Sequence, residues 1–179
     1  MTSSIRNAFL GIGAILSASC ATTSIAPPAS LSAHDSRRIS QEVRQQILDW
    51  GQAWVVGDAA ETFELAPLFD AYYQDNILAF DTSDDAGQTV IRGRDEFIGI
   101  WEPFVRSWDV WRFDVQPDSI DVRVLAPDAA VATLFIDNYG RSADGTEFIG
   151  PAQGTVLMRR TDGQWRIVHE HISLPRKEP

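Results

Sequence analysis

The segment QWRIVHEHIS, residues Gln164–Ser173, has the composition of a β-strand and contains two of the three histidines in the chain. In a β-strand, successive side chains point to opposite faces of the sheet. Strict alternation predicts one face that carries both histidines, made by Trp165, Ile167, His169, His171 and Ser173. Glu170 is predicted to lie on the opposite face. The function of the protein therefore depends on what the histidine-bearing face contacts.

Four further strands are predicted upstream of this segment, so the second half of the chain should form a sheet. The strands are expected at 108–116, 119–125, 129–139, 147–160 and 164–174, with turns that contain Pro, Asp or Gly between them. The fourth strand is interrupted by Gly150-Pro151. A glycine and a proline inside a strand predict a bulge or a bend at that position.

The part of the domain before these strands is predicted to be mainly helical. Apolar residues recur at spacings of three and four between positions 36 and 56, which indicates an amphipathic helix. Gly57 is expected to end this helix, and Asp58 with Glu61 to cap the next one. Further elements are expected as a strand at 76–82, a turn at 83–87, a strand at 88–92 and a helix at 94–106. Helices followed by strands indicate an α+β fold.

The N-terminal region is predicted to be a targeting segment. Arg6 precedes a short apolar stretch at 8–16, and small residues lead to the only cysteine, Cys20. Residues 1–20 therefore resemble a secretory signal, which is too short to span a membrane. The position of Cys20 also suits lipidation of a bacterial lipoprotein, so simple secretion and lipid anchoring both remain open. The expected location is the periplasm or the cell envelope.

Domain organisation and charge restrict the partners. Residues 21–35 are expected to be a flexible tether, 36–174 one domain and 175–179 a tail. The formal net charge is −10, which repels nucleic acid, and contact with a membrane is expected only through a lipid on Cys20. The single cysteine excludes an internal disulfide. The sequence contains no nucleotide-binding glycine motif and no zinc-type cysteine cluster, so no cofactor and no metal are expected.

Several motifs together resemble one family. Trp54 stands before Gly57-Asp58, the run 73–76 (YQDN) precedes a predicted strand, and the chain closes on 162–173 (DGQWRIVHEHIS). In this order they resemble the SnoaL-like group of the nuclear transport factor 2 superfamily. The resemblance implies a cone formed by a strongly curved antiparallel sheet packed on N-terminal helices, with an apolar pocket open at one end. It also implies a small apolar ligand and a homodimer through the sheet. Members include polyketide cyclases, ketosteroid isomerase, dehydratases and proteins with no known reaction.

The resemblance suggests an acid–base site but supplies only part of it. Asp81, eight residues after Tyr73, corresponds to the carboxylate base of ketosteroid isomerase. Trp50 takes the position of the tyrosine acid of that enzyme, and an indole cannot transfer a proton near neutral pH. Asp137 is the remaining candidate for a partner acid. The alternative for Asp81 is a turn residue.

His169 and His171 admit three interpretations. They can face the pocket as acid–base or ligand-contacting groups, because histidine titrates near neutral pH. They can bind a metal through a His-x-His pair, but the sequence offers no second histidine cluster as a further ligand. They can also be structural residues that bond to neighbouring strands. Asp137 is likewise open between a functional and a turn-capping role.

The remaining candidates are residues that would contact a ligand. Six tryptophans are available, of which most are expected in the core and two or three at the pocket. The predicted ligand contacts are Trp50, Trp54, Tyr73, Trp101, Tyr139, Gln153 and Trp165. The first hypothesis is an exported pocket protein that binds, isomerises, cyclises or hydrates a small apolar molecule. The alternative hypothesis is a non-catalytic binding or assembly module tethered to the envelope.

Overall fold

The computed structural model describes residues 31–58, 60–82 and 88–174. The predicted signal segment, Cys20, most of the predicted tether, the turn at 83–87 and the tail at 175–179 lie outside these residues, and the predictions about them remain predictions. None of the described helices is long and apolar enough to cross a bilayer.

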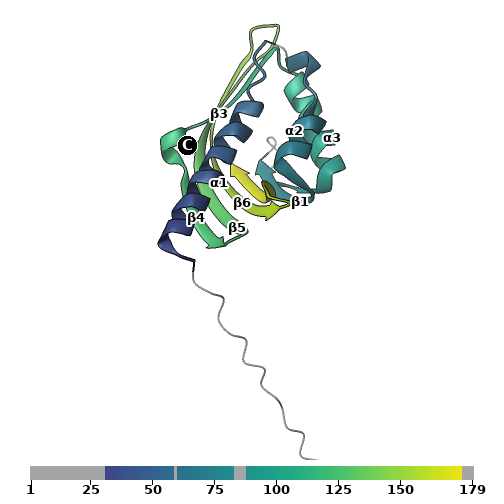
Figure 1. Ribbon diagram of the computed structural model, residues 1–179. Helices are drawn as coiled ribbons and strands as arrows, with labels where there is room; N and C mark the ends of the chain where they lie inside the picture. Colours follow the sequence, from purple (N-terminus) through teal and green to yellow (C-terminus); the bar gives the residue numbers. More distant parts are fainter. Residues whose placement is uncertain (1–30, 59, 83–87, 175–179) are drawn as a thin grey trace, which may run out of the picture. The chain divides into compact units, whose positions relative to one another are not determined.

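The structure is an α+β fold, as predicted (Figure 1). Its helices are α1 (Ala33–Ala53), α2 (Leu65–Tyr72) and α3 (Gly93–Arg106), with 3₁₀ turns at Ala60–Thr62 and Pro117–Ser119. Its strands are β1 (Tyr73–Thr82), β2 (Gln88–Arg92), β3 (Val110–Val115), β4 (Asp121–Ala126), β5 (Ala129–Arg141), β6 (Glu147–Thr161) and β7 (Gln164–Ser173). The predicted elements therefore exist, with shifted ends.

Helix α1 shows why those ends shift. The Ser32 hydroxyl accepts a hydrogen bond of 3.0 Å from the backbone N–H of Asp35, so the helix begins three residues before the predicted start. The helix stops at Ala53, and Gly57 is not its cap. Instead, Gly57 adopts a φ of 61° beyond the helix and forms an isolated bridge with Trp111. The end of α1 is thus held against β3.

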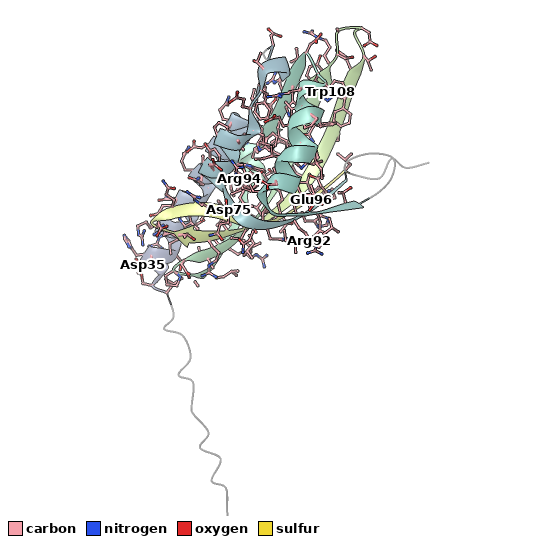
Figure 2. The ribbon with its side chains drawn as sticks, turned by 90° about the vertical axis from the view of Figure 1, so that its right-hand side faces the viewer. Asp35, Asp75, Arg92, Arg94, Glu96 and Trp108 are labelled. Carbon is pink, nitrogen blue, oxygen red and sulfur yellow. The ribbon has the colours of Figure 1, made fainter. Side chains whose placement is uncertain are left out.

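Helix α3 begins at Gly93, one residue before the predicted start. Gly93 has a φ of 77°, a conformation that favours glycine, and the Glu96 carboxylate accepts a 2.8 Å hydrogen bond from the N–H of Arg92. Arg94 binds Asp70 of α2 at 2.9 Å. Figure 2 shows Arg94 and Glu96 near one end of α3 and Trp108 just beyond the other. These contacts fix the helix that supplies part of the cavity wall described below.

The strands form one curved sheet that does not close (Figure 1). Their order is β2-β1-β7-β6-β5-β3, and β4 pairs with β5 beside β3. All pairings are antiparallel except that of β1 with β7, which is parallel, so the sheet is mixed. Alternate residues of β5 and β6 are buried, and they join the helices in one apolar core. The other face of the sheet is more exposed.

Strict alternation along β7 is wrong, because the strand contains a β-bulge. Ile167 pairs with Met158 of β6 and His169 pairs with the next residue, Leu157, which leaves Val168 as an extra residue. An extra residue reverses the faces of everything that follows it. Trp165 and Ile167 are buried, but after the bulge the buried residues are Glu170 and Ile172. His169 and His171 therefore lie on the opposite face from the one predicted.

Of the bulge or bend predicted at Gly150-Pro151, the bulge is wrong. The register of β5 and β6 continues without a shift through the pairs Asn138–Gly150 and Asp137–Pro151. Within the described part of the chain, pairing of β6 with β7 starts only at Gln153, so Pro151 has no described neighbouring strand on that edge of β6. Proline is tolerated at such an edge because no N–H is needed there.

Candidate functional site

A cavity of about 230 Å³ lies in the apolar core. Nine of its fourteen lining residues are aromatic, two are acidic, and the others are an asparagine and two aliphatic residues. The lining residues are Trp50, Trp54, Tyr73, Asp81, Phe97, Trp101, Phe104, Trp111, Phe113, Asn138, Phe148, Glu170, Ile172 and Leu174. Among these described residues no Lys, Arg or His is present, so any charge that the wall carries is negative.

Regular spacing on the helices α1 and α3 and rings from the strands β3 and β6 build the aromatic wall. Trp50 and Trp54 are one turn apart near the end of α1, and Trp101 and Phe104 are three residues apart on α3, so each pair shares a helix face. Trp111 on β3 stacks on a neighbouring ring of β6, Phe148, with an interplanar angle of 16°. Helices and sheet thus contribute rings from different sides.

A buried chain of hydrogen bonds ends at Glu170. The indole N–H of Trp50 donates to the Tyr73 hydroxyl at 2.8 Å, and this hydroxyl donates to Oε2 of Glu170 at 3.2 Å. Trp50 and Tyr73 are 1% exposed and Glu170 is 3% exposed. The second oxygen of Glu170 takes no part in this chain. The arrangement holds one carboxyl group in a defined orientation inside an apolar wall.

Burial raises the pKa of Glu170 from an ordinary value of 4.5 to about 8. The negative charge of Asp81 raises this pKa further, and the hydrogen bond from Tyr73 lowers it. The carboxyl group is therefore mostly protonated at neutral pH and can donate a hydrogen bond or a proton. Burial also raises the pKa of Tyr73 well above its usual range, so the hydroxyl remains a donor.

Asp81 lies in the same cavity on the adjacent strand. Glu170 pairs with Ala79 of β1, and Asp81 follows two residues later on the same face. Asp81 is 6% exposed. The parallel pairing of β1 and β7 therefore brings together two carboxyl groups that are 89 residues apart in the sequence. Asn138 of β5 adds a buried side-chain oxygen that has no hydrogen-bond partner among the described residues.

Five of the predicted site residues meet at this cavity, namely Trp50, Trp54, Tyr73, Asp81 and Trp101. The two predicted histidines do not line it. His169 Nδ1 lies 2.6 Å from the carbonyl oxygen of Leu78, and the ring of His171 lies 6.2 Å from that of Phe80 on β1. Both contacts are on the opposite face of the sheet.

The other predicted residues also lie away from the cavity. Asp137 is exposed and accepts a 2.9 Å hydrogen bond from Gln116, because alternation on β5 turns Asn138 inward instead. Tyr139 donates to Glu147 at 2.9 Å. Gln153 is exposed on β6. Trp165 is buried beneath Arg160, whose guanidinium carbon is 4.7 Å from the ring centroid, and therefore packs outside the cavity.

Two important lining residues were not predicted. Glu170 was placed on the wrong face because nothing in the sequence marks Val168 as a bulge. Alternation along β5 allows only one of Asp137 and Asn138 to face inward. Packing of the sheet decides which one, so the sequence did not identify Asn138. The described part of the chain has no cluster of three His, Cys, Asp or Glu side chains placed to hold a metal.

Comparisons with known proteins agree with this architecture. The family model described as a SnoaL-like domain matches residues 43–177. A search of curated proteins gives no match. A nuclear transport factor 2-like protein of unknown function from Pseudomonas putida is 30% identical, with a TM-score of 0.59 and coverage of 79% of this chain and 90% of that chain.

More distant structures share the fold alone. A nuclear transport factor 2-like superfamily protein from Salmonella enterica is 18% identical, with a TM-score of 0.61 and coverage of 80% of this chain and 95% of that chain. A hexachlorocyclohexane dehydrochlorinase is 13% identical, with a TM-score of 0.59 and coverage of 81% and 90%. From the family match and the fold together, the chain belongs to the SnoaL-like domain family, within the nuclear transport factor 2-like superfamily.

Proposed function

We propose that the domain binds a small, mainly apolar molecule in the cavity and transfers a proton within it. The observation that carries this proposal is the pair of carboxyl groups in one aromatic cavity. Glu170 is protonated near neutral pH, and Asp81 supplies the negative charge beside it. Two carboxyl groups held in different protonation states provide an acid and a base in the same site.

The proton transfer can be written as a balanced cycle. Asp81 removes a proton from a carbon next to a carbonyl group, and Glu170 gives its proton to the carbonyl oxygen, which yields an enol. The enol then returns its hydroxyl proton to Glu170 while Asp81 delivers its proton to a second carbon. The net reaction is an isomerisation that regenerates both residues. Trp50 and Tyr73 act as positioning residues, because they hold Glu170 by hydrogen bonds.

Deuterium exchange tests the proposed reaction. In heavy water, the wild-type protein should accelerate exchange of the protons beside the carbonyl of a β,γ-unsaturated cyclohexenone, followed by NMR. Asp81→Asn and Glu170→Gln should each slow this exchange by at least about 100-fold, a typical contribution of a general acid or base. Asp118→Asn, which makes the same change at an exposed position of the Pro117–Ser119 turn, should keep the wild-type rate. Equal rates for wild type and the two cavity variants would contradict the proposal.

The alternative is a tethered, non-catalytic binding module. The large aromatic share of the wall supports binding without requiring chemistry. Under this alternative, ligands would bind in the cavity but the exchange rate would not depend on Asp81 or Glu170.

A homodimer through the exposed face of the sheet is part of the proposal. Apolar side chains on that face include Phe135, which is 48% exposed, Ile149, which is 73% exposed, and Val90, which is 39% exposed. Native mass spectrometry of protein purified from its own host should show twice the mass of one processed chain, plus any retained small molecule. A monomer mass at micromolar concentration would contradict the dimer.

A further inference from the structure

We propose that the cavity takes an organic cation, namely a small molecule with a substituted ammonium group on an apolar body. The inference rests on the proposed function only in using this cavity as the ligand site, and it does not depend on proton transfer. It follows from three features of the wall, which are the sign of its charges, the arrangement of its rings and its size.

The polar side chains of the wall present oxygen atoms to the cavity. The acidic side chains that line the cavity are Asp81 and Glu170, which are 6% and 3% exposed. The described lining includes no Lys, Arg or His. In surroundings of low dielectric, a negative charge attracts a cation far more strongly than it does in water. An anionic ligand would be repelled from the same site.

The rings surround the cavity on several sides instead of forming a flat slot. Phe104 is nearly perpendicular to Trp101, at 89°, and to Trp111, at 83°. Trp50 meets Phe113 at 77°. A flat neutral ring stacks best between parallel walls, whereas a rounded ammonium group is attracted to the faces of several rings at once.

The indole nitrogens strengthen this interpretation. The nitrogens of Trp101 and Trp111 are buried without a partner among the described residues. Because these nitrogens are shielded although the residues line the cavity, a ligand would contact ring carbon atoms and not N–H groups. The carbon face is the part of an indole that attracts a cation.

The volume limits the ligand to about one substituted ring. The cavity measures about 230 Å³. An engineered cavity of about 150 Å³ in another protein holds benzene, so this one has room for a ring with a few further heavy atoms. A phenyl group bearing a trimethylammonium group is of this size.

A pair of isosteric probes separates charge from shape. The cation meta-(trimethylammonio)phenol and neutral meta-tert-butylphenol differ mainly in having a positive nitrogen in place of a carbon. Calorimetric titration of the full chain with each probe should give a dissociation constant at least about tenfold lower for the cation. Equal or tighter binding of the neutral phenol would overturn the inference and leave the proposed binding function intact. Failure of both probes to bind would count against the cation site and against the proposed function as well.

Two variants locate the source of the preference. Asp81→Asn should reduce the ratio of the two dissociation constants to near one, while Asp118→Asn, at an exposed site, should leave it unchanged. The second variant controls for general attraction by the net charge of −10. A cation preference that survives Asp81→Asn but disappears in high salt would overturn the inference, since that pattern indicates surface attraction. The comparison in the wild-type protein remains decisive even if Asp81→Asn does not fold.

Discussion

Glu170→Gln should remove a large part of the pH dependence of folding stability. The folded-state pKa of Glu170 is about 8, against an ordinary value of 4.5 for an unfolded chain. Between these values the folded protein holds a proton that the unfolded chain has lost. The stability that depends on this proton is fully present below the unfolded pKa and is lost as pH rises through the folded pKa.

The expected size follows from the same linkage. This group should lower the free energy of unfolding of the wild type by about 1.4 kcal/mol per pH unit in that window. The loss is on the order of 4 kcal/mol between about pH 5 and pH 8. The glutamine variant lacks the titrating group, so it should be similar to wild type near pH 5 and more stable near pH 8.

Urea denaturation at several pH values measures this difference. Glu64→Gln is a suitable control, because Glu64 is exposed at the start of α2 and makes no capping hydrogen bond there. The control should follow the wild-type slope. Parallel pH profiles for wild type and Glu170→Gln would show that Glu170 is not a buried protonated acid, and would remove the acid from the proposed reaction.

Deletion of Val168 should destabilise the protein strongly. Without the extra residue, the strand cannot keep Trp165 and Ile167 buried and also keep Glu170 and Ile172 buried. One of these two pairs must turn outward, and the side chains next to that pair along the strand must then turn toward the core. If Trp165 and Ile167 turn outward, the lost burial of two apolar side chains costs about 3–6 kcal/mol. If the downstream half turns, two histidines enter the apolar core, which adds a further cost.

The matched control is Val168→Ala, which keeps the number of residues and removes only a half-buried side chain. We expect this variant to lose about 1 kcal/mol or less, because little apolar surface is involved. Both variants can be compared by thermal unfolding followed by circular dichroism. A deletion variant as stable as Val168→Ala would mean that the strand tolerates either register, and the assignment of Glu170 to the cavity would then fail.

The fold could be predicted from the sequence because its signals are periodic and repeated. The stripe on α1, including Ile39, Val43 and Ile47, and the turn residues between strands give the order of elements within a few residues. The ends differ where a single side chain decides them, as Ser32 does for α1. The parallel pairing of β1 with β7 could not be read from either strand, because it depends on how distant segments pack.

The site could be predicted only in part, because the faces of some strands depend on how distant segments pack. Trp50, Trp101 and Asp81 reach the cavity because each lies on a regular element with one buried face. Glu170 was missed because the bulge residue, Val168, is a β-branched residue typical of an uninterrupted strand. On β5 the predicted site residues Asp137 and Tyr139 lie on the wrong face, since only packing of the sheet decides whether they or Asn138 point inward.

The position of β7 has a consequence for synthesis of the chain. It is the last strand the structure describes, yet it lies between β1 and β6 in the sheet. While the ribosome is still producing it, β1 and β6 each present an unpaired edge, and such edges readily pair with other chains. A truncated product would also lack Glu170 and hence one member of the carboxyl pair. The cavity can therefore be completed only after the full domain has been translated, and a prematurely terminated chain would be a target for aggregation and proteolysis.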